Sequence, residues 1–343
     1  MKNEKDLKNY DIRTDLVLDI LSNNTLSKGI TIQENTLNNI NITSVSIDDD
    51  NNNLNKSKGK YITISYNDVT DKDNYKNLEN ILVDELKKIF DYLNIDFNKK
   101  CLVIGLGNRD STPDSLGPKV IDNILVTRYL YDVEKIEVDP NYRNVSSFIP
   151  GVTGSTGIES SDVIKGLIEK TNPDFLIIID ALASSSIERV NKTIQITDTG
   201  INPGSGVYNN RGELSEKTLG IPVISIGVPT VIEAYVLVSD TIRYLLKNIS
   251  YNKDNYNKNK LVPAHMRKYN NYDKELTIDE KRQVLGEVGI LDEESIKELI
   301  FEVLTPIGYN MMITPKEIDF IIDKTSKLIS SAINKSLHKK FDI

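Results

Sequence analysis

Short apolar runs rich in β-branched residues alternate with longer amphipathic segments through the middle of the chain, and this alternation restricts the fold more than any other feature. It is typical of a mostly parallel sheet flanked by helices, because a strand that helices cover on both faces is apolar throughout. The predicted strands are 61–66, 101–107, 174–180, 193–198 and 222–229, and the predicted helices are 77–93, 116–130, 162–170, 231–246, 293–304 and 315–337. The sequence therefore predicts an α/β fold with a C-terminal helical extension over 293–337.

Two polar segments interrupt this pattern. Residues 47–60 and 248–260 are rich in Asn, Lys and Asp and poor in large apolar side chains, which is typical of solvated loops or linkers. Helix caps are predicted at Ser160 or Ser161 and at Thr230, because a hydroxyl can accept hydrogen bonds from the free amides of a first turn. We expect residues 16–343 to form one α/β domain, with a polar linker near 248–260 inside it.

The composition excludes several classes of protein. The single cysteine, Cys101, begins an apolar run and is predicted to be a buried thiol in a reducing compartment. The N-terminal residues lack the apolar core of a signal peptide, and no run is long enough to span a membrane, so we expect a cytoplasmic protein without a membrane partner. The net charge of −8 and the scattered lysines argue against direct binding to nucleic acid.

Two aspartates are placed where chemistry is expected. Asp180 ends the predicted strand 174–180, and Asp114 lies in the loop GLGNRDSTPDSLGP that follows strand 101–107. Ligands of open α/β sheets bind outside the carboxyl ends of the strands, so these side chains are expected to face one another. Two close carboxylates share a proton, so one can activate water while the other protonates a leaving amine. The pair predicts peptide hydrolysis.

The same residues allow a second interpretation. Asp114 is also well placed to cap the helix that begins near Leu116, and Asp180 to accept hydrogen bonds from loop amides. The residues alone leave both interpretations open.

Glycine-rich loops are expected near the aspartates. Gly105 and Gly107 permit backbone geometry closed to other residues, and Asn108 follows them. Gly154 and Gly157 lie in the loop GVTGSTG, which precedes the predicted helix 162–170. Neither loop completes a nucleotide-binding fingerprint, because the first lacks the third glycine and the second lacks the Walker lysine. We predict instead that these five residues line a substrate groove.

Other catalytic patterns are weaker. The triplet Asp198-Thr199-Gly200 resembles the signature of pepsin-type proteases, but it occurs once, and that architecture needs two copies in an all-β setting. The two histidines, His265 and His338, have no second ligand at i, i+4 spacing. We predict no metal and no cofactor, although a carboxylate-only metal site on the two aspartates stays open.

Several long motifs carry a family resemblance. They are GLGNRDSTPDSLGP, PGVTGSTGIESSDVI, NPDFLIIIDALASSSIERVNKTIQITDTGINPGSG, LGIPVISIGVPTV and LTPIGYNMMITPKEIDFIIDK. Together they resemble the germination protease of bacterial spores, over most of 61–246 and much of 283–338. The resemblance implies that Asp114 and Asp180 are catalytic and that the fold is similar to that of hydrogenase-maturation peptidases.

The resemblance also implies a biological setting. It predicts that small acid-soluble spore proteins are the substrates, that the enzyme is located in the forespore or spore core, and that it forms a homotetramer. It implies a self-processing zymogen in which 1–15 is a propeptide, because RTDLVLD (13–19) resembles the processing site. Cleavage is expected between Asp15 and Leu16. Val17 and Asp19 stand where the family tends to have Ala and Glu, and the heptapeptide on its own is also compatible with a β-strand.

The leading hypothesis is an aspartate-dependent endopeptidase that initiates the degradation of small acid-soluble spore proteins during germination. One alternative is a metal-dependent peptidase of the maturation type that uses the same acids. Another is a non-catalytic α/β module whose glycine loops bind a nucleotide or an anion.

Overall fold

The computed structural model describes residues 16–21, 29–132, 137–203, 212–255, 263, 272, 274–304 and 311–341. The chain forms two compact units. The larger contains Arg13–Ser184, Glu188–Val231 and Thr314–Ile343, and the smaller is built mainly on Ile232–Ile313. The predicted aspartates both belong to the larger unit.

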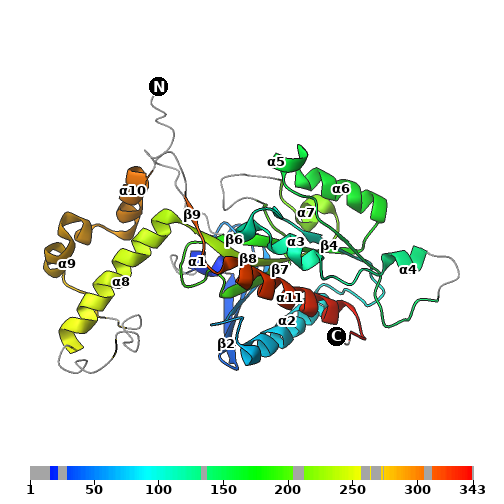
Figure 1. The fold of residues 1–343 in the computed structure, drawn as a ribbon, viewed down its shortest axis with the longest axis horizontal. Helices are drawn as coiled ribbons and strands as arrows, with labels where there is room; N and C mark the ends of the chain where they lie inside the picture. Colours follow the sequence, from blue (N-terminus) through cyan, green and yellow to red (C-terminus); the bar gives the residue numbers. More distant parts are fainter. Residues whose placement is uncertain are drawn as a thin grey trace. The chain divides into compact units, whose positions relative to one another are not determined.

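The described elements of the chain form a mixed α/β structure (Figure 1). The strands are β1 (Ile30–Leu37), β2 (Ile40–Ile47), β3 (Gly59–Ser65), β4 (Cys101–Gly105), β5 (Val145–Phe148), β6 (Phe175–Ser184), β7 (Thr193–Thr197), β8 (Val223–Glu233) and β9 (Met312–Ile313). The helices are α1 (Val17–Leu21), α2 (Lys72–Tyr92), η2 (Thr112–Asp114), α3 (Leu116–Ile121), α4 (Arg128–Asp132), α5 (Thr153–Thr156), α6 (Ser160–Thr171), α7 (Glu216–Leu219), α8 (Ala234–Asn255), α9 (Ile278–Leu285), η5 (Gly286–Ile290), α10 (Glu293–Leu304) and α11 (Ile318–Leu337).

The strands join in the order β1-β2-β3-β7-β8-β6-β4-β5, and β9 pairs with β8. The α/β class is confirmed. Pairing is parallel where β4 meets β5 and β6, and antiparallel from β1 through β2, β3 and β7 to β8. The parallel part holds both strands that lead to the predicted aspartates, so their carboxyl ends lie at the same edge of the sheet.

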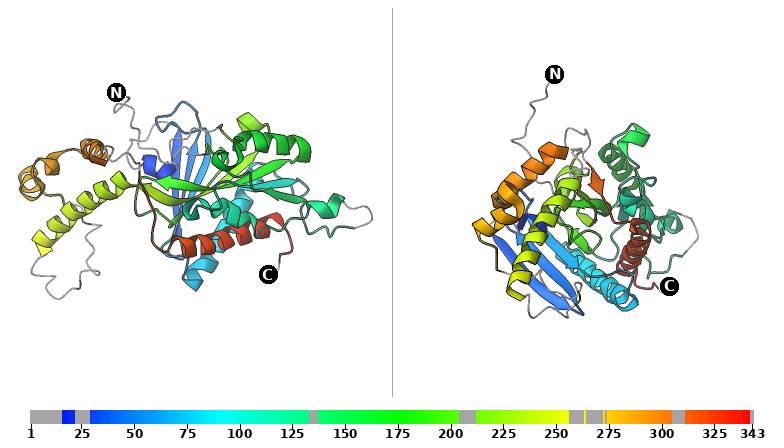
Figure 2. Two further views of the ribbon diagram at one scale, coloured as in Figure 1. Left: turned by 45° about the horizontal axis from the view of Figure 1, so that its top comes forward. Right: turned by 60° about the vertical axis from the view of Figure 1, so that its left-hand side comes forward.

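Helices of the larger unit cover both faces of this sheet. On one face, α2, α3 and α11 enclose a core with Val103, Ile177 and Ile194. On the other, α6 and α7 pack on Leu102 and Ile178. Figure 2 shows α6 on one side of the strands and α2 and α11 on the other. Residues of one strand alternate between the two cores because successive side chains point to opposite faces.

A β-hairpin extends the sheet beyond the strands that the sequence analysis predicts. Its strands β1 and β2 meet at Asn38 and Asn39, which have φ values of 50° and 63°. Two adjacent left-handed residues form the turn that best fits the twist of a hairpin, and Asn tolerates this conformation. The Asn38-Asn39 pair, between two segments in which apolar and polar residues alternate, could have predicted this hairpin from the sequence. Strand β1 is polar and exposed because it is the edge strand of the sheet.

Several predicted boundaries are wrong. The helix predicted for 116–130 is divided into α3 and α4. Strand β8 continues to Glu233, so Thr230 lies inside the strand and caps nothing; the extension pairs with β9, a contact distant in the sequence. The predicted linker 248–260 is helical up to Asn255, the end of α8, and its remaining residues lie outside the described ranges.

The cap predicted at Ser160 or Ser161 is also wrong. Glu159 occupies the N-cap position of α6 and makes no side-chain capping bond. Both serines are buried within the first turn. Packing of that turn therefore outweighs the local preference of serine for a cap.

Two predictions about burial can be compared with the structure. Cys101 is a buried, unpaired thiol, as predicted. Within the parts of the chain that the structure describes, no helix combines the length and the apolar character needed to cross a membrane.

Candidate active site

Asp114 is held by the loop that leaves β4. Its Oδ2 accepts a hydrogen bond of 2.7 Å from the backbone amide of Asn108. Gly107 has a φ of +110°, and a Cβ added there would lie 2.0 Å from the carbonyl oxygen of Asp114. Glycine is therefore required for the loop to close on the aspartate. Asp114 does not cap α3, whose N-cap is Ser115 and carries no side-chain capping bond.

Asp180 lies inside β6, which continues to Ser184, and not at a strand end as predicted. The neighbouring strand β4 is shorter, and its last pair is Gly105 with Ile179. Asp180 thus begins the part of β6 that extends past β4. The carboxylate is buried, with 7% of the residue exposed, and its Oδ1 accepts a 2.9 Å hydrogen bond from the amide of Ala181.

The two aspartates belong to segments that contact each other. The short helix η2, which ends at Asp114, packs against β6. The amide of Leu106, one residue after β4, donates a 2.8 Å hydrogen bond to the carbonyl oxygen of Ile179. Leu106 is thus bonded to the residue that precedes Asp180, and the next residue, Gly107, lies against Asp114. Two carboxylates carried by contacting segments could together accept a proton from water and return one to a leaving group.

The other predicted groove residues have different environments. A Cβ added to Gly105 would lie 2.4 Å from the carbonyl oxygen of Gly117, so this glycine allows β4 and α3 to pack backbone against backbone. Asn108 contributes its amide to Asp114. Gly154 lies in α5 and Gly157 ends it, and a Cβ at either would meet no heavy atom within 4 Å. These two glycines border open space.

Asp198 joins two strands of the sheet through a hydrogen bond. Its Oδ1 accepts a 2.7 Å hydrogen bond from the amide of Lys60, which ties the end of β7 to the start of β3. Burial raises the pKa of its carboxyl group, against the opposing effect of hydrogen bonds from Lys60 and its own backbone. The triplet that resembles the pepsin signature thus joins two strands.

The segment that follows the predicted cleavage position packs on the sheet. Asp15 lies outside the described residues, but Leu16 and Val17 are fully buried. The segment forms helix α1 and not the strand considered above. The amide of Val17 donates a 2.9 Å hydrogen bond to Oε1 of Gln195 in β7. Sequence reasoning missed this contact because the two residues are 178 positions apart.

The structure describes one of the two histidines. His338 is buried at the end of α11, where its Nδ1 accepts a 3.1 Å hydrogen bond from the amide of Arg143. Burial and the charge of Arg143 lower the pKa of His338. His265 lies outside the described residues. Among the residues that the structure does describe, no three His, Cys, Asp or Glu side chains group as metal ligands.

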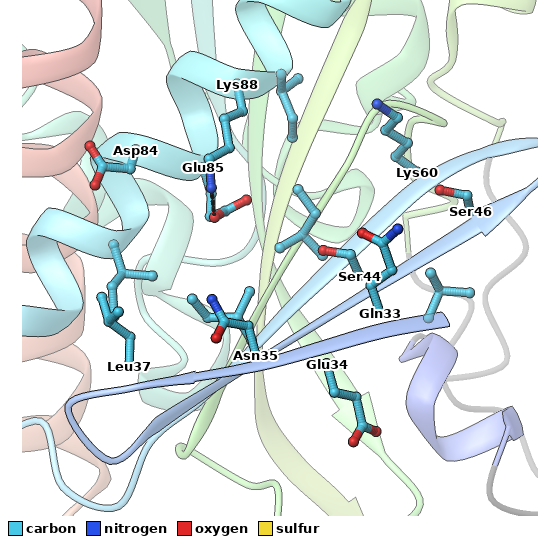
Figure 3. Close-up of a pocket in the computed structure, with 15 residues that line it drawn as sticks. Gln33, Glu34, Asn35, Leu37, Ser44, Ser46, Lys60, Asp84, Glu85 and Lys88 are labelled. Atoms are coloured by element: carbon cyan, nitrogen blue, oxygen red, sulfur yellow. Dashed lines mark hydrogen bonds and ion pairs between the residues drawn. The ribbon is translucent and has the colours of Figure 1, made fainter. Parts of the chain in front are cut away.

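A groove of about 500 Å³ lies between the β1–β2 hairpin and α2 (Figure 3). Charged side chains, among them Asp84, Glu85 and Lys88, line it, with Lys88 and Glu85 forming an ion pair. Ile62 also lines this groove and belongs to the core beneath α2. Asp180 alternates with residues of that core along β6, so its side chain points to the opposite face.

The described elements define a mixed α/β protein with helices on both faces of its sheet. The chain belongs to the germination protease family, whose model matches residues 14–343. It is 42% identical to the germination protease of Priestia megaterium over 361 residues, covering 100% of this chain and 98% of the relative. It is 43% identical to that of Bacillus subtilis over 355 residues, covering 99% and 96%. The protein is therefore a peptidase with a role in spore germination.

A NiFe hydrogenase maturation protease from Thermococcus kodakarensis matches 43% of this chain and 80% of its own, with 16% identity and a TM-score of 0.27.

Proposed function

We propose that this chain is an endopeptidase in which Asp114 and Asp180 catalyse hydrolysis of the peptide bond. The observation that carries the proposal is the contact of η2 with β6, which holds the loop of one aspartate against the strand of the other. One carboxylate removes a proton from water as the water attacks the scissile carbonyl. The other donates its proton to the departing amine. The proton of the pair therefore ends on the carboxylate that acted as base, and the two carboxylates can exchange roles in the next cycle.

The proposed substrates are small acid-soluble spore proteins, degraded at germination in the spore core. Family membership supports a protein substrate in the spore. The net charge of −8 is compatible with a basic substrate and makes direct binding of a phosphate backbone unfavourable.

We also propose that the chain is made as a zymogen that cleaves itself between Asp15 and Leu16. Leu16 and Val17 are buried, and Val17 is bonded to the sheet, which supports a processed chain that begins at a buried residue. Mild acidification or dehydration should convert the precursor to a chain starting at Leu16, as measured by mass spectrometry. Fully active enzyme that keeps Met1 would contradict this part of the proposal.

A homotetramer is the proposed assembly. The smaller unit supports association, because it exposes large apolar side chains on α8, α9 and α10 that water would otherwise contact. These include Leu245, Ile278 and Leu299. Light scattering on the intact chain would give the assembly mass, and a monomer at micromolar concentration would contradict the proposal.

Replacement of each aspartate tests the catalytic pair. Asp114→Asn and Asp180→Asn keep the shape of the side chain and remove its acid–base function, so each should lower the rate of cleavage of a small acid-soluble spore protein by about 10²-fold or more. Asp110→Asn is the matched control, because Asp110 is an exposed aspartate of the same loop. Full activity in either folded variant of the pair would refute the dyad. Undiminished activity after exhaustive chelation would separate this mechanism from a metallopeptidase.

A further inference from the structure

Phe148 is an exposed aromatic residue at the end of β5, the strand at one edge of the sheet. Its exposed fraction is 38%, whereas its partner across the strand pair, Ile104, is fully buried in the core beneath α6 and α7. The cover that these two helices give to their face of the sheet therefore does not extend over the end of β5.

Phe148 lies on the same face of the sheet as Asp180. Paired residues have their side chains on one face, and Phe148 pairs with Ile104, which in turn pairs with Ile178. Asp180 is two residues beyond Ile178 along β6, so its side chain returns to that face. One side of the sheet thus carries an exposed aromatic ring and a proposed catalytic carboxylate.

Strand geometry sets the distance between these two residues. Two strand spacings of about 4.8 Å separate β5 from β6, and Asp180 lies two residues, of about 3.3 Å each, beyond the row of Phe148. The two Cα atoms are therefore about 12 Å apart. A bound peptide in extended conformation covers this distance in about three and a half residues.

The loop after β5 has room for a ligand above its backbone. A Cβ added to Gly154 or Gly157 would meet no heavy atom within 4 Å. Ile158, which follows the short helix α5 of this loop, has an exposed fraction of 54%. Large apolar side chains thus stand exposed at both ends of an open segment, where an apolar side chain of a bound peptide can remove them from water.

The chain's own segment shows in which direction a bound peptide crosses Asp180. Val17, the second residue after the proposed cut, donates its amide to Gln195 in β7, two strands from β6 on the side away from β4. Gln195 alternates with Ile194 and Ile196 of the first core, so it lies on the face of Asp180. A peptide that crosses in this direction has the residues before its scissile bond over β4 and β5.

The sequence before the proposed cut has an apolar residue at the matching spacing. Ile12 is the fourth residue on the N-terminal side of the bond between Asp15 and Leu16, and both of its neighbours are charged. In an extended chain the fourth residue lies about 12 Å from the bond. The spacing in the substrate sequence and the spacing on the sheet therefore agree.

We infer that Phe148 forms an apolar specificity subsite, which binds the side chain of the fourth residue on the N-terminal side of the scissile bond in a protein substrate. The inference rests on the proposed peptidase activity and deepens it, because it names a feature of the substrate. An apolar side chain that covers the ring of Phe148 removes apolar surface of both from water. Substrates with an apolar residue at this position are preferred to those with a small or charged one.

Synthetic peptides with the sequence of residues 8–22 test the subsite. One keeps the isoleucine of position 12, and one carries Ile12→Ala. A third exchanges the residues of positions 12 and 13, so that the apolar side chain points to the opposite side of an extended chain. The full-length enzymes are the wild type, Phe148→Ala and Phe148→Leu. Tyr92→Ala is the matched control, because Tyr92 is an exposed aromatic residue on α2, which covers the opposite face.

The quantity measured is the ratio of kcat/KM for the isoleucine peptide to kcat/KM for the alanine peptide. The active fraction and competition from the chain's own segment affect both peptides equally, so they cancel in the ratio. We expect a ratio of about five in the wild type and in Tyr92→Ala, because a partly covered isoleucine gains part of the value of full burial. Phe148→Ala should lower the ratio to about one, and Phe148→Leu should keep most of it. The exchanged peptide should behave like the alanine peptide.

A binding measurement separates this inference from the proposed catalytic pair. The dissociation constants of the same peptides with full-length Asp180→Asn enzyme, measured by fluorescence anisotropy, should differ by the same ratio without any cleavage. Cleavage by this variant would refute the dyad, and the ratio would still decide the subsite.

Three results would overturn the subsite. The first is a ratio, in binding and in cleavage, that Phe148→Ala leaves unchanged or that is one already in the wild type. The second is a preference for isoleucine at position 12 when mass spectrometry of the products locates the cut at another bond. The third is a change of assembly mass in Phe148→Ala with an unchanged ratio, which would assign Phe148 to a contact between subunits.

Discussion

The backbone amide of Leu106 donates a hydrogen bond of 2.8 Å to the carbonyl oxygen of Ile179. This bond continues the parallel pairing of β4 with β6 one step past the last paired residue of β4. It fixes the point at which the chain turns away toward Asp114, directly beside Asp180. The candidate site is therefore determined by the register of two buried strands, which is strongly specified where both faces are covered.

Substitution of Gly107 should disturb the site, whereas substitution of Gly154 should not. Gly107→Ala brings a Cβ within 2.0 Å of the Asp114 carbonyl oxygen at a φ of +110°, so we expect a loss of more than about 1 kcal/mol in the free energy of unfolding, together with loss of peptidase activity. Gly154→Ala meets no atom within 4 Å and should change stability by no more than about 1 kcal/mol. Chemical denaturation and a cleavage assay measure both effects. Equal behaviour of the two variants would contradict the role given to Gly107.

Asp198 should be dispensable for catalysis. Asp198→Asn keeps an acceptor for the amide of Lys60, so cleavage should stay within about twofold of the wild-type rate, whereas loss of a general base costs about 10²-fold or more. A large loss of activity in a folded variant would revive the pepsin-like interpretation.

The pH dependence of stability provides a second measurement on Asp198. Burial raises the pKa of its carboxyl group in the folded state. The unfolded chain therefore loses its proton first as the pH rises above about 4, and the ionised group favours unfolding. Asp198→Asn should remove this contribution, so its stability relative to the wild type should increase between pH 4 and pH 7. Denaturation curves at several pH values measure it, and a relative decrease would contradict the cause assigned here.

His338 should make the fold sensitive to acid. Its pKa is lowered by burial and by the charge of Arg143. As the pH falls below about 6.5, His338 is therefore protonated in the unfolded chain before it is protonated in the folded chain. Stability should therefore fall from pH 7 to pH 5. His338→Asn, which keeps an acceptor for the amide of Arg143, should be less stable at pH 7 but should show a flatter dependence over this range. An identical slope in the two proteins would exclude His338 as a source.

Cys101 should be unreactive in the folded protein. Burial raises the pKa of its thiol, and the thiolate is the reactive form. A disulfide reagent should therefore modify it at least about 10³-fold more slowly than in the unfolded chain, because modification must wait for opening of the core. The chain has one cysteine, so the labelling rate reports this site alone. Rapid labelling under native conditions would show that β4 is accessible.

Much of the fold was determined by local sequence. Strands β4, β6 and β7 and helices α6 and α10 were predicted to within a few residues, because apolar runs and helical periodicity are visible within one segment. Both aspartates were proposed as catalytic for the same reason, since each follows an apolar run. The polar edge strand β1 was missed because edge strands have one partner and need no apolar face.

Tertiary structure decided the rest. The extension of β8 to Glu233, the break after Ile121 and the packing of Asp114 against β6 depend on pairings between distant segments, which local patterns do not encode. The same is true of the contact between Asp19 and Arg189, separated by 170 positions. Through a resemblance, the sequence alone predicted cleavage between Asp15 and Leu16. Only the folded chain shows that Asp19 is buried in an ion pair with Arg189, because burying a carboxylate requires a charged partner that the sheet brings to it.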